Sequence, residues 1–155
     1  AIISGLNKSG FRLLRNENVV IKRASDSIFL AGVENWGHPP FPQYARLEKA
    51  INGIPDSAFT ILMTHDPAHW ESKIKGKKNI ELTLSGHTHG FQWGVKLGGI
   101  PFSPAALAQK NWGGLYRKGN SHLYVNTGLG TVGIPWRIDM KPEITVLRLK
   151  RSEID

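Results

Sequence analysis

The sequence predicts a mixed α/β fold that is dominated by strands and has few helices. Short apolar or alternating runs are bounded by Gly, Pro, Asn and Ser, as strands usually are. Only residues 42–53 and 68–74 follow a helical rhythm. With 155 residues, of which 40% are hydrophobic and 21% charged, the chain has the composition of a globular protein. We see no internal repeat or linker and treat residues 1–155 as a single segment.

The first strand signals form a pair, at residues 19–23 and 28–33, with a turn at 25–27. Residues 59–64 form a largely apolar run that predicts a buried strand. Residues 80–84 alternate apolar and polar side chains, which is typical of a half-buried strand.

The last two strands are predicted at residues 123–126 and 143–149. The predicted helix at 42–53 ends at Gly53 and places four apolar side chains on one face: Tyr44, Leu47, Ala50 and Ile51. Long loops rich in Gly and Trp join the later strands. Because loops at strand ends commonly carry function, we expect the chemistry of the protein there.

The composition excludes several kinds of site. The absence of cysteine excludes disulfides, thiolate zinc sites and cysteine nucleophiles, and it leaves the compartment undecided. The formal net charge is +8, but the basic residues are scattered, and the densest run, 73–78, is typical of a solvated loop. We therefore expect phosphorylated or otherwise anionic partners, and no specific nucleic acid. No apolar run is long enough to cross a bilayer.

The strongest functional signal is a pair of histidines, His87 and His89, directly after the strand at 80–84. Gly86 and Gly90 frame the pair and permit a tight turn. Two imidazoles separated by one residue can reach two sides of a metal cluster, and imidazole is a good ligand for Zn, Mn, Fe or Ni.

A third candidate ligand, His65, follows the buried strand at 59–64. Neighbouring strands that end at the same sheet edge would bring His65 toward His87 and His89, so we predict that all three bind metal. The remaining histidines lack this setting and are predicted not to be ligands: His38, His69 and His122.

Three motifs, in this order and spacing, resemble the calcineurin-like metallophosphoesterases. The similarity extends from about Phe11 to Leu149 and is greatest to a bacterial branch whose members are often membrane-associated phosphohydrolases. The motifs are Thr64-His65-Asp66-Pro67, Ser85-Gly86-His87-Thr88-His89-Gly90-Phe91-Gln92 and Tyr124-Val125-Asn126-Thr127-Gly128-Leu129-Gly130-Thr131.

The resemblance implies half of a four-layer αββα sandwich and a phosphomonoesterase or phosphodiesterase activity. His65 and His87 would bind one divalent metal and His89 the other, with Thr88 and Gln92 on the substrate side or supporting the ligands. The two ions, Mn, Zn, Fe or Ni, would share a hydroxide that attacks phosphorus. The substrate would be a phosphorylated small molecule or a lipid-like ester, and the whole protein would associate with a membrane surface.

The family's acidic motifs are absent from this sequence. No aspartate is followed two positions later by histidine or preceded by glycine, and residues 119–122 match Gly-Asn-His only with an inserted serine. In the family these motifs precede the region matched here. We therefore expect a C-terminal portion that holds no catalytic residue, with the catalytic histidine upstream, binds metal weakly or not at all, and is inactive alone. The alternative is a non-catalytic basic domain that binds an anionic partner.

Three further patterns bear on the function. Gly128, Gly130 and Gly133 match the spacing of a dinucleotide-binding loop, but Pro135 follows where a helix should begin, so we reject that interpretation. A metallo-β-lactamase would require Asp-His just beyond the histidine pair, which is absent. Tryptophans in the predicted loops favour packing, with contact to a lipid interface as the alternative: Trp93, Trp112 and Trp136.

Overall fold

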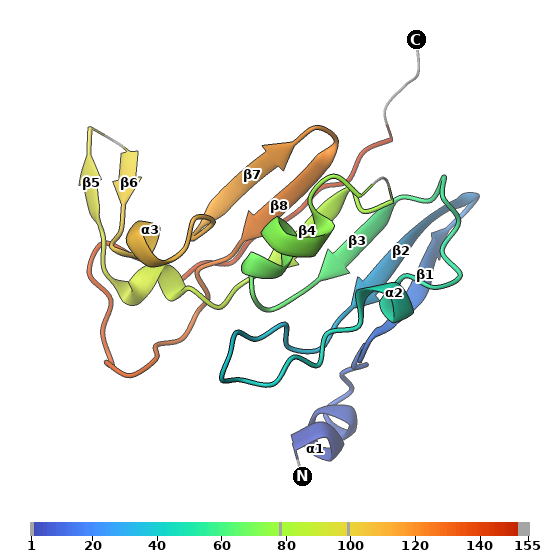
Figure 1. Cartoon of the computed structure of the whole chain (residues 1–155), viewed down its shortest axis with the longest axis horizontal. Helices are drawn as coiled ribbons and strands as arrows, with labels where there is room; N and C mark the ends of the chain where they lie inside the picture. Colours follow the sequence, from blue (N-terminus) through green and yellow to red (C-terminus); the bar gives the residue numbers. More distant parts are fainter. Residues whose placement is uncertain (1, 78, 99, 152–155) are drawn as a thin grey trace.

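The computed structural model describes residues 2–77, 79–98 and 100–151. Within them the chain forms a six-stranded mixed sheet in the order β1-β2-β3-β4-β8-β7 and a separate two-stranded sheet, β5-β6 (Figure 1). The strands are β1 Glu17–Arg23, β2 Asp26–Gly32, β3 Thr60–Met63, β4 Leu82–Ser85, β5 Val95–Leu97, β6 Ile100–Phe102, β7 Gly114–Lys118 and β8 Ser121–Val125. This mixed sheet confirms the predicted α/β class.

The helices are short. They are α1 Ile2–Lys8, α2 Leu47–Ala50, the π-helix η1 Trp70–Ile74, the 3₁₀ segment η2 His89–Gln92 and α3 Ala105–Ala108. The α1 helix contains no buried residue and lies beside the body of the sheet (Figure 1). No helix in the described part of the chain has the length and apolar character needed to cross a membrane.

The central strands β2, β3, β4 and β8 are parallel, so their carboxyl ends lie at one edge of the sheet. Antiparallel hairpins close both sides, β1 with β2 and β7 with β8. The predicted first strand pair is confirmed, but the turn is shorter than predicted. Arg23 pairs with Asp26, which leaves only residues 24 and 25 in the turn, and Ala24 adopts a left-handed φ of 52°.

The hydrophobic core lies on one face of the sheet, where α2 and η1 pack against the strands (Figure 1). Its buried members are Ala31, Leu47, Leu62, Trp70, Ile74, Ile80, Leu123 and Val125. Burial of this apolar surface is the main source of the stability of the fold.

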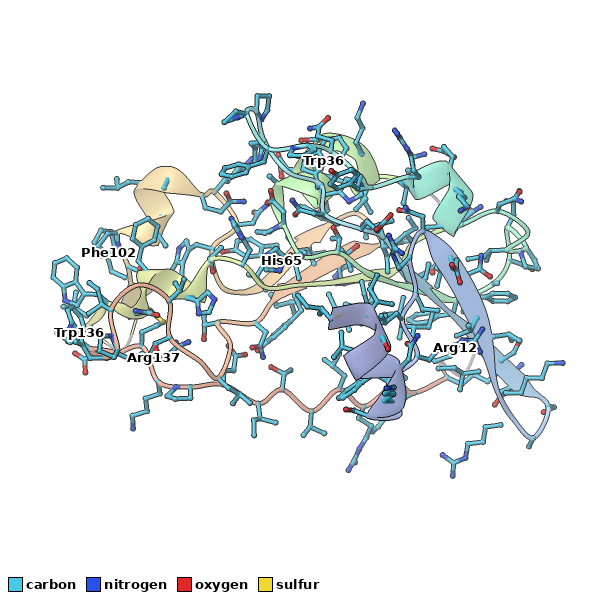
Figure 2. The ribbon with its side chains drawn as sticks, turned by 90° about the horizontal axis from the view of Figure 1, so that it is seen from below. Arg12, Trp36, His65, Phe102, Trp136 and Arg137 are labelled. Atoms are coloured by element: carbon cyan, nitrogen blue, oxygen red, sulfur yellow. The ribbon has the colours of Figure 1, made fainter. Side chains whose placement is uncertain are left out.

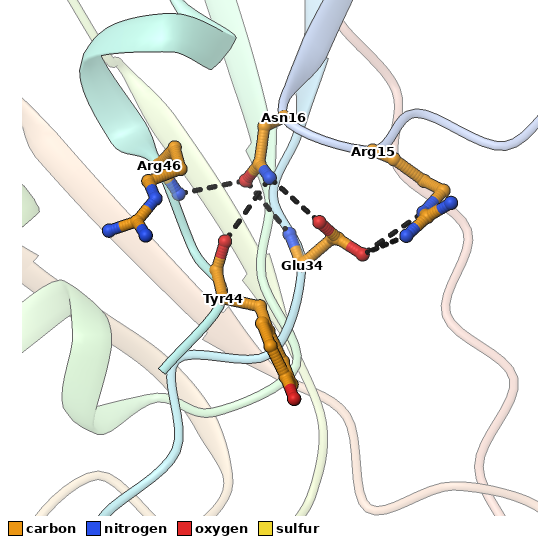
Figure 3. Close-up of polar contacts among 5 residues, drawn as sticks. All are labelled: Arg15, Asn16, Glu34, Tyr44 and Arg46. Atoms are coloured by element: carbon orange, nitrogen blue, oxygen red, sulfur yellow. Dashed lines mark hydrogen bonds and ion pairs between the residues drawn. The ribbon is translucent and has the colours of Figure 1, made fainter. Parts of the chain in front are cut away.

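The predicted helix at 42–53 is wrong in its first half. Only α2 is helical, because Asn16 fixes the preceding loop in an extended form (Figure 3). The Asn16 side chain accepts a hydrogen bond from the Arg46 amide (2.8 Å) and donates one to the Tyr44 carbonyl (3.2 Å). These backbone groups are thereby withheld from a helix, and Tyr44 is exposed instead of joining the core face.

The strand predicted at 80–84 is observed as β4 at Leu82–Ser85, and its polar Thr83 faces the core. Thr83 is fully buried on the covered face, whereas Leu82 and Leu84 are only partly buried on the other. Thr83 aligns with Leu62 on β3 and Leu123 on β8, both fully buried, so the register with its neighbours places this polar side chain inside.

The strand predicted at 143–149 is also wrong, because this segment joins no β-ladder in the structure. It crosses the sheet behind β8 (Figure 1) and is held by side chains and by one backbone hydrogen bond, from the Glu143 amide to the Gly128 carbonyl (3.1 Å). The side-chain amide of Asn126 donates to the Thr145 hydroxyl (2.9 Å), and the backbone amide of Thr127 donates to the Glu143 carboxylate (2.9 Å). A strand needs a neighbouring edge for its backbone groups, and none is aligned with this segment.

Candidate metal centre

The carboxyl ends of three parallel strands bring the predicted ligand loops together. The loop after β3 carries His65, and the loop after β4 carries His87 and His89. The amide of Gly86 and the hydroxyl of Ser85 both donate to the His65 carbonyl, at 3.1 and 2.8 Å. The Asn126 amide, after β8, donates to the Ser85 carbonyl at 2.9 Å. Backbone bonds therefore fix the three loops to one another.

His65 and His87 face each other at this edge. The His87 Nδ1 atom lies 3.1 Å from the His65 Nε2 atom, and the two rings meet edge to face at 78°. Two imidazole nitrogens on one metal, each at about 2.1 Å, would be about 3 to 3.4 Å apart. The separation of these two atoms therefore fits two ligands of one ion.

The local environment favours the neutral form of His65. Partial burial lowers the pKa of His65, and the neighbouring His87 lowers it further, while Asp66 acts in the opposite direction. Neutral imidazole is the metal-binding form. Of the predicted meeting of His65 with His87 and His89, the structure shows the contact with His87 only, and the binding of metal by all three stays a prediction.

His89 lies apart from the pair. Its Nδ1 atom is 3.5 Å from Nη2 of Arg137. Its ring lies against Gly128, since a Cβ added to that glycine would be 3.9 Å from the imidazole. Across residues 2–77, 79–98 and 100–151, no three His, Asp or Glu side chains are grouped so that they could hold a single ion. The described residues thus offer one pair of candidate ligands, His65 and His87, and one separate candidate, His89.

The loop that carries His87 and His89 is strained. Residues 89–92 all have positive φ, and so does His87, at 73°. Non-glycine residues rarely adopt this conformation, and such strain gathers at functional sites. At position 90 glycine is favoured for a second reason, because a Cβ there would lie 2.6 Å from the sulfur of Met140.

Thr88 and Gln92 hold this loop in place. The Thr88 hydroxyl donates to the Trp112 carbonyl at 2.6 Å. Gln92 is buried, and its side-chain amide donates to the Ile134 carbonyl at 2.9 Å. Both side chains therefore bind backbone carbonyls of neighbouring loops and hold the loop of His87 and His89 in position.

Sequence reasoning missed two residues beside the site. Nε2 of His38 lies 3.2 Å from the buried carboxylate of Asp66, the neighbour of His65. Arg137 donates to the Thr127 carbonyl at 2.9 Å and to the Gly130 carbonyl, and so fixes the loop that faces His89. Neither lies in a recognisable motif, and only the folded loops bring them to this edge.

The other two predicted non-ligand histidines, His122 and His69, have other partners. His122 is on β8, and its Nδ1 is 3.2 Å from the Glu81 carbonyl. His69 is fully buried, stacks on Trp36 with ring centroids 4.5 Å apart, and approaches the Thr64 hydroxyl with Nδ1 at 3.0 Å. Burial lowers the pKa of His69 to about 4.

The chain is similar to several metallophosphoesterases along nearly its whole length. It is 33% identical to the metallophosphoesterase YkuE of Bacillus subtilis over 151 residues, 95% of this chain and 49% of YkuE. It is 32% identical to a transmembrane protein with metallophosphoesterase domain from Danio rerio (95% of this chain, 34% of that protein). It is 30% identical to the phosphodiesterase YaeI of Escherichia coli (93% and 49%).

The chain thus spans about half the length of YkuE and YaeI, and about a third of the Danio rerio protein. No family model and no solved structure matches it.

Proposed function

The chain belongs to the calcineurin-like metallophosphoesterase superfamily, and from this premise we propose that it supplies the histidine half of a dinuclear phosphoric ester hydrolase site. The observation that carries the proposal is the pair of His65 Nε2 and His87 Nδ1, 3.1 Å apart at the carboxyl edge of the parallel strands. His65 and His87 would hold one divalent ion, and His89 the other.

The chemistry follows from two cations near one phosphoester. Such ions lower the pKa of a shared water and offset the charge that develops on the phosphoryl oxygens. In this chain the role of the residues is to place the ligands: Thr88 and Gln92 fix the loop of His87 and His89, and Arg137 fixes the loop that faces His89. Mn, Zn, Fe and Ni all suit imidazole ligands.

The carboxylates of a complete site are proposed to come from polypeptide outside these 155 residues. Two cations held close together repel each other strongly unless anionic ligands offset their charge. Histidines are neutral ligands and provide no such charge. The chain alone is therefore proposed to bind metal weakly and to lack turnover.

The substrate is proposed to be a phosphorylated small molecule or a lipid-like phosphoester, with the whole protein at a membrane surface. The names of two relatives support this, one a phosphodiesterase and the other a transmembrane protein with a metallophosphoesterase domain. The net charge of +8 favours an anionic substrate.

The test is hydrolysis of bis(p-nitrophenyl) phosphate with Mn²⁺ by the intact protein. His87→Ala should abolish turnover, because it removes one of the paired ligands. His122→Ala is the matched control, since this histidine lies on β8 away from the pair, and it should retain turnover. Full activity in His87→Ala would refute the assignment.

For the 155-residue chain alone, titration with Mn²⁺ should give weak, substoichiometric binding. Tight binding of two ions per chain would contradict the proposal that essential ligands lie outside it.

A further inference from the structure

The loops beyond the strand ends expose large apolar side chains that the proposed chemistry does not use. They come from η2, the β5-β6 sheet and the segment after β8, and we name six of them the apolar loop surface: Phe91, Trp93, Phe102, Ile134, Trp136 and Ile138. Each is about half exposed. Figure 2 shows Phe102 and Trp136 at the same end of the molecule.

Hydrogen bonds hold these loops side by side. Trp93 and Ile138 form a β-bridge, and the Gly94 amide donates to the Ile138 carbonyl at 2.9 Å. The buried amide of Gln92 donates to the Ile134 carbonyl. The side chains are therefore presented by a hydrogen-bonded backbone in this chain.

The segments that carry this surface are basic. Residues 91–102 and 130–141 contain three basic residues, Lys96, Arg137 and Lys141, and one acidic residue, Asp139. Lys110 pairs with Glu71 at 3.0 Å, and the Arg137 guanidinium is bonded to carbonyl groups. The charge of Lys110 is therefore offset by Glu71, whereas Arg137 keeps its positive charge and Lys141 is exposed.

We propose that the apolar loop surface binds the surface of a bilayer that contains anionic phospholipids. Tryptophan with aliphatic residues and surrounding basic charge is the combination that favours a lipid interface. Anionic headgroups would match the positive charge. A single-stranded nucleic acid would instead need a cationic groove along its backbone, whereas every side chain that defines this surface is apolar.

This inference deepens the membrane association in the proposed function, on which it rests for its biological setting, and it identifies the contact surface. Phe91 is two residues from His89, so docking by these loops would place the histidine edge next to the headgroups. A phosphoester headgroup would then be the substrate that the site meets first.

The test is co-sedimentation of the full chain with vesicles of phosphatidylcholine alone or mixed with phosphatidylglycerol. Binding should be stronger to the mixed vesicles and fall as salt is raised. Trp136→Ser should weaken partition by about tenfold, because an inserted side chain of this size contributes at least about 1.4 kcal/mol. Phe41→Ser is the control, since Phe41 is 68% exposed in a loop outside the apolar loop surface, and it should bind like the parent.

A second measurement uses a substitution that retains an aromatic side chain and should not destabilise the fold. Brominated lipids should quench tryptophan fluorescence in the parent chain, and Trp136→Phe should reduce the quenching while retaining binding. Two results would overturn the proposal: no binding to anionic vesicles, or equal binding by the parent and Trp136→Ser. Displacement of the vesicles by a single-stranded oligonucleotide would also overturn it, in favour of a nucleic-acid surface. His87→Ala should bind vesicles normally, so a failure of hydrolysis is distinguishable from a failure of docking.

Discussion

One face of the six-stranded sheet is closed by α2 and η1, whereas much of the opposite face is open to solvent. On the covered face the aligned residues of four neighbouring strands are all fully buried: Ala31, Leu62, Thr83 and Leu123. One position further along, on the opposite face, Met63 is partly exposed, and Leu115 at the β7 edge is 65% exposed. The difference indicates that the stability of this chain resides in the covered face.

The C-terminal segment crosses the open face behind β8 (Figure 1). Ile144 and Val146 are 81% and 89% exposed, although the sequence alternates there as a strand should. The segment is attached by the side chains of Glu143 and Thr145 and by one backbone hydrogen bond, from the Glu143 amide to the Gly128 carbonyl, without forming a β-ladder. A large exposed apolar area of this kind is typical of a contact surface.

The largest expected effect is at the centre of the covered face. Leu62→Ala should lower the free energy of unfolding by about 3 kcal/mol, because it leaves a cavity among fully buried neighbours. Urea unfolding followed by circular dichroism would measure this. A loss below about 1 kcal/mol would mean that the covered face is not the main source of stability.

A smaller effect should appear with pH. His69 is buried on the covered face, and burial lowers its pKa to about 4, whereas the unfolded chain has the ordinary value near 6.5. The unfolded state therefore takes up a proton first as pH falls, and folding stability is lost between pH 6.5 and 4. Between pH 7 and pH 5 the loss from His69 should be about 2 kcal/mol.

The measurement compares unfolding at both pH values in the parent chain and in His69→Asn, whose amide can replace the contact of Nδ1 with Thr64. The variant should show a shallower dependence on pH. If the pH dependence of unfolding were unchanged in the variant, groups other than His69 would be its cause.

The smallest effect is expected on the open face. Leu115→Ala should change the free energy of unfolding by less than about 0.5 kcal/mol, since the side chain is mostly exposed. The same unfolding assay applies. A loss comparable to that of Leu62→Ala would show that the open face is occupied in solution, for example by another copy of the chain.

The sequence was sufficient to predict most strands and the meeting of His65 with His87, because hydrophobic patterning and a motif after a strand are local signals. It was insufficient where distant residues decide. The helix at 42–53 is shortened by Asn16, which lies about 30 residues earlier. Thr83 is turned inward by the register of its neighbours. Arg137 reaches the His89 loop only through folding.

The left-handed stretch from His89 to Gln92 limits how the sequence of this loop can vary. A β-branched residue at position 89, 91 or 92 would meet a steric penalty whether or not it contacts metal. Gly90 is restricted further by Met140. Neutral drift is therefore expected to be slow at positions with no chemical role, and random libraries directed at this loop should yield few folded members. Glycine and asparagine would be the replacements that retain its shape.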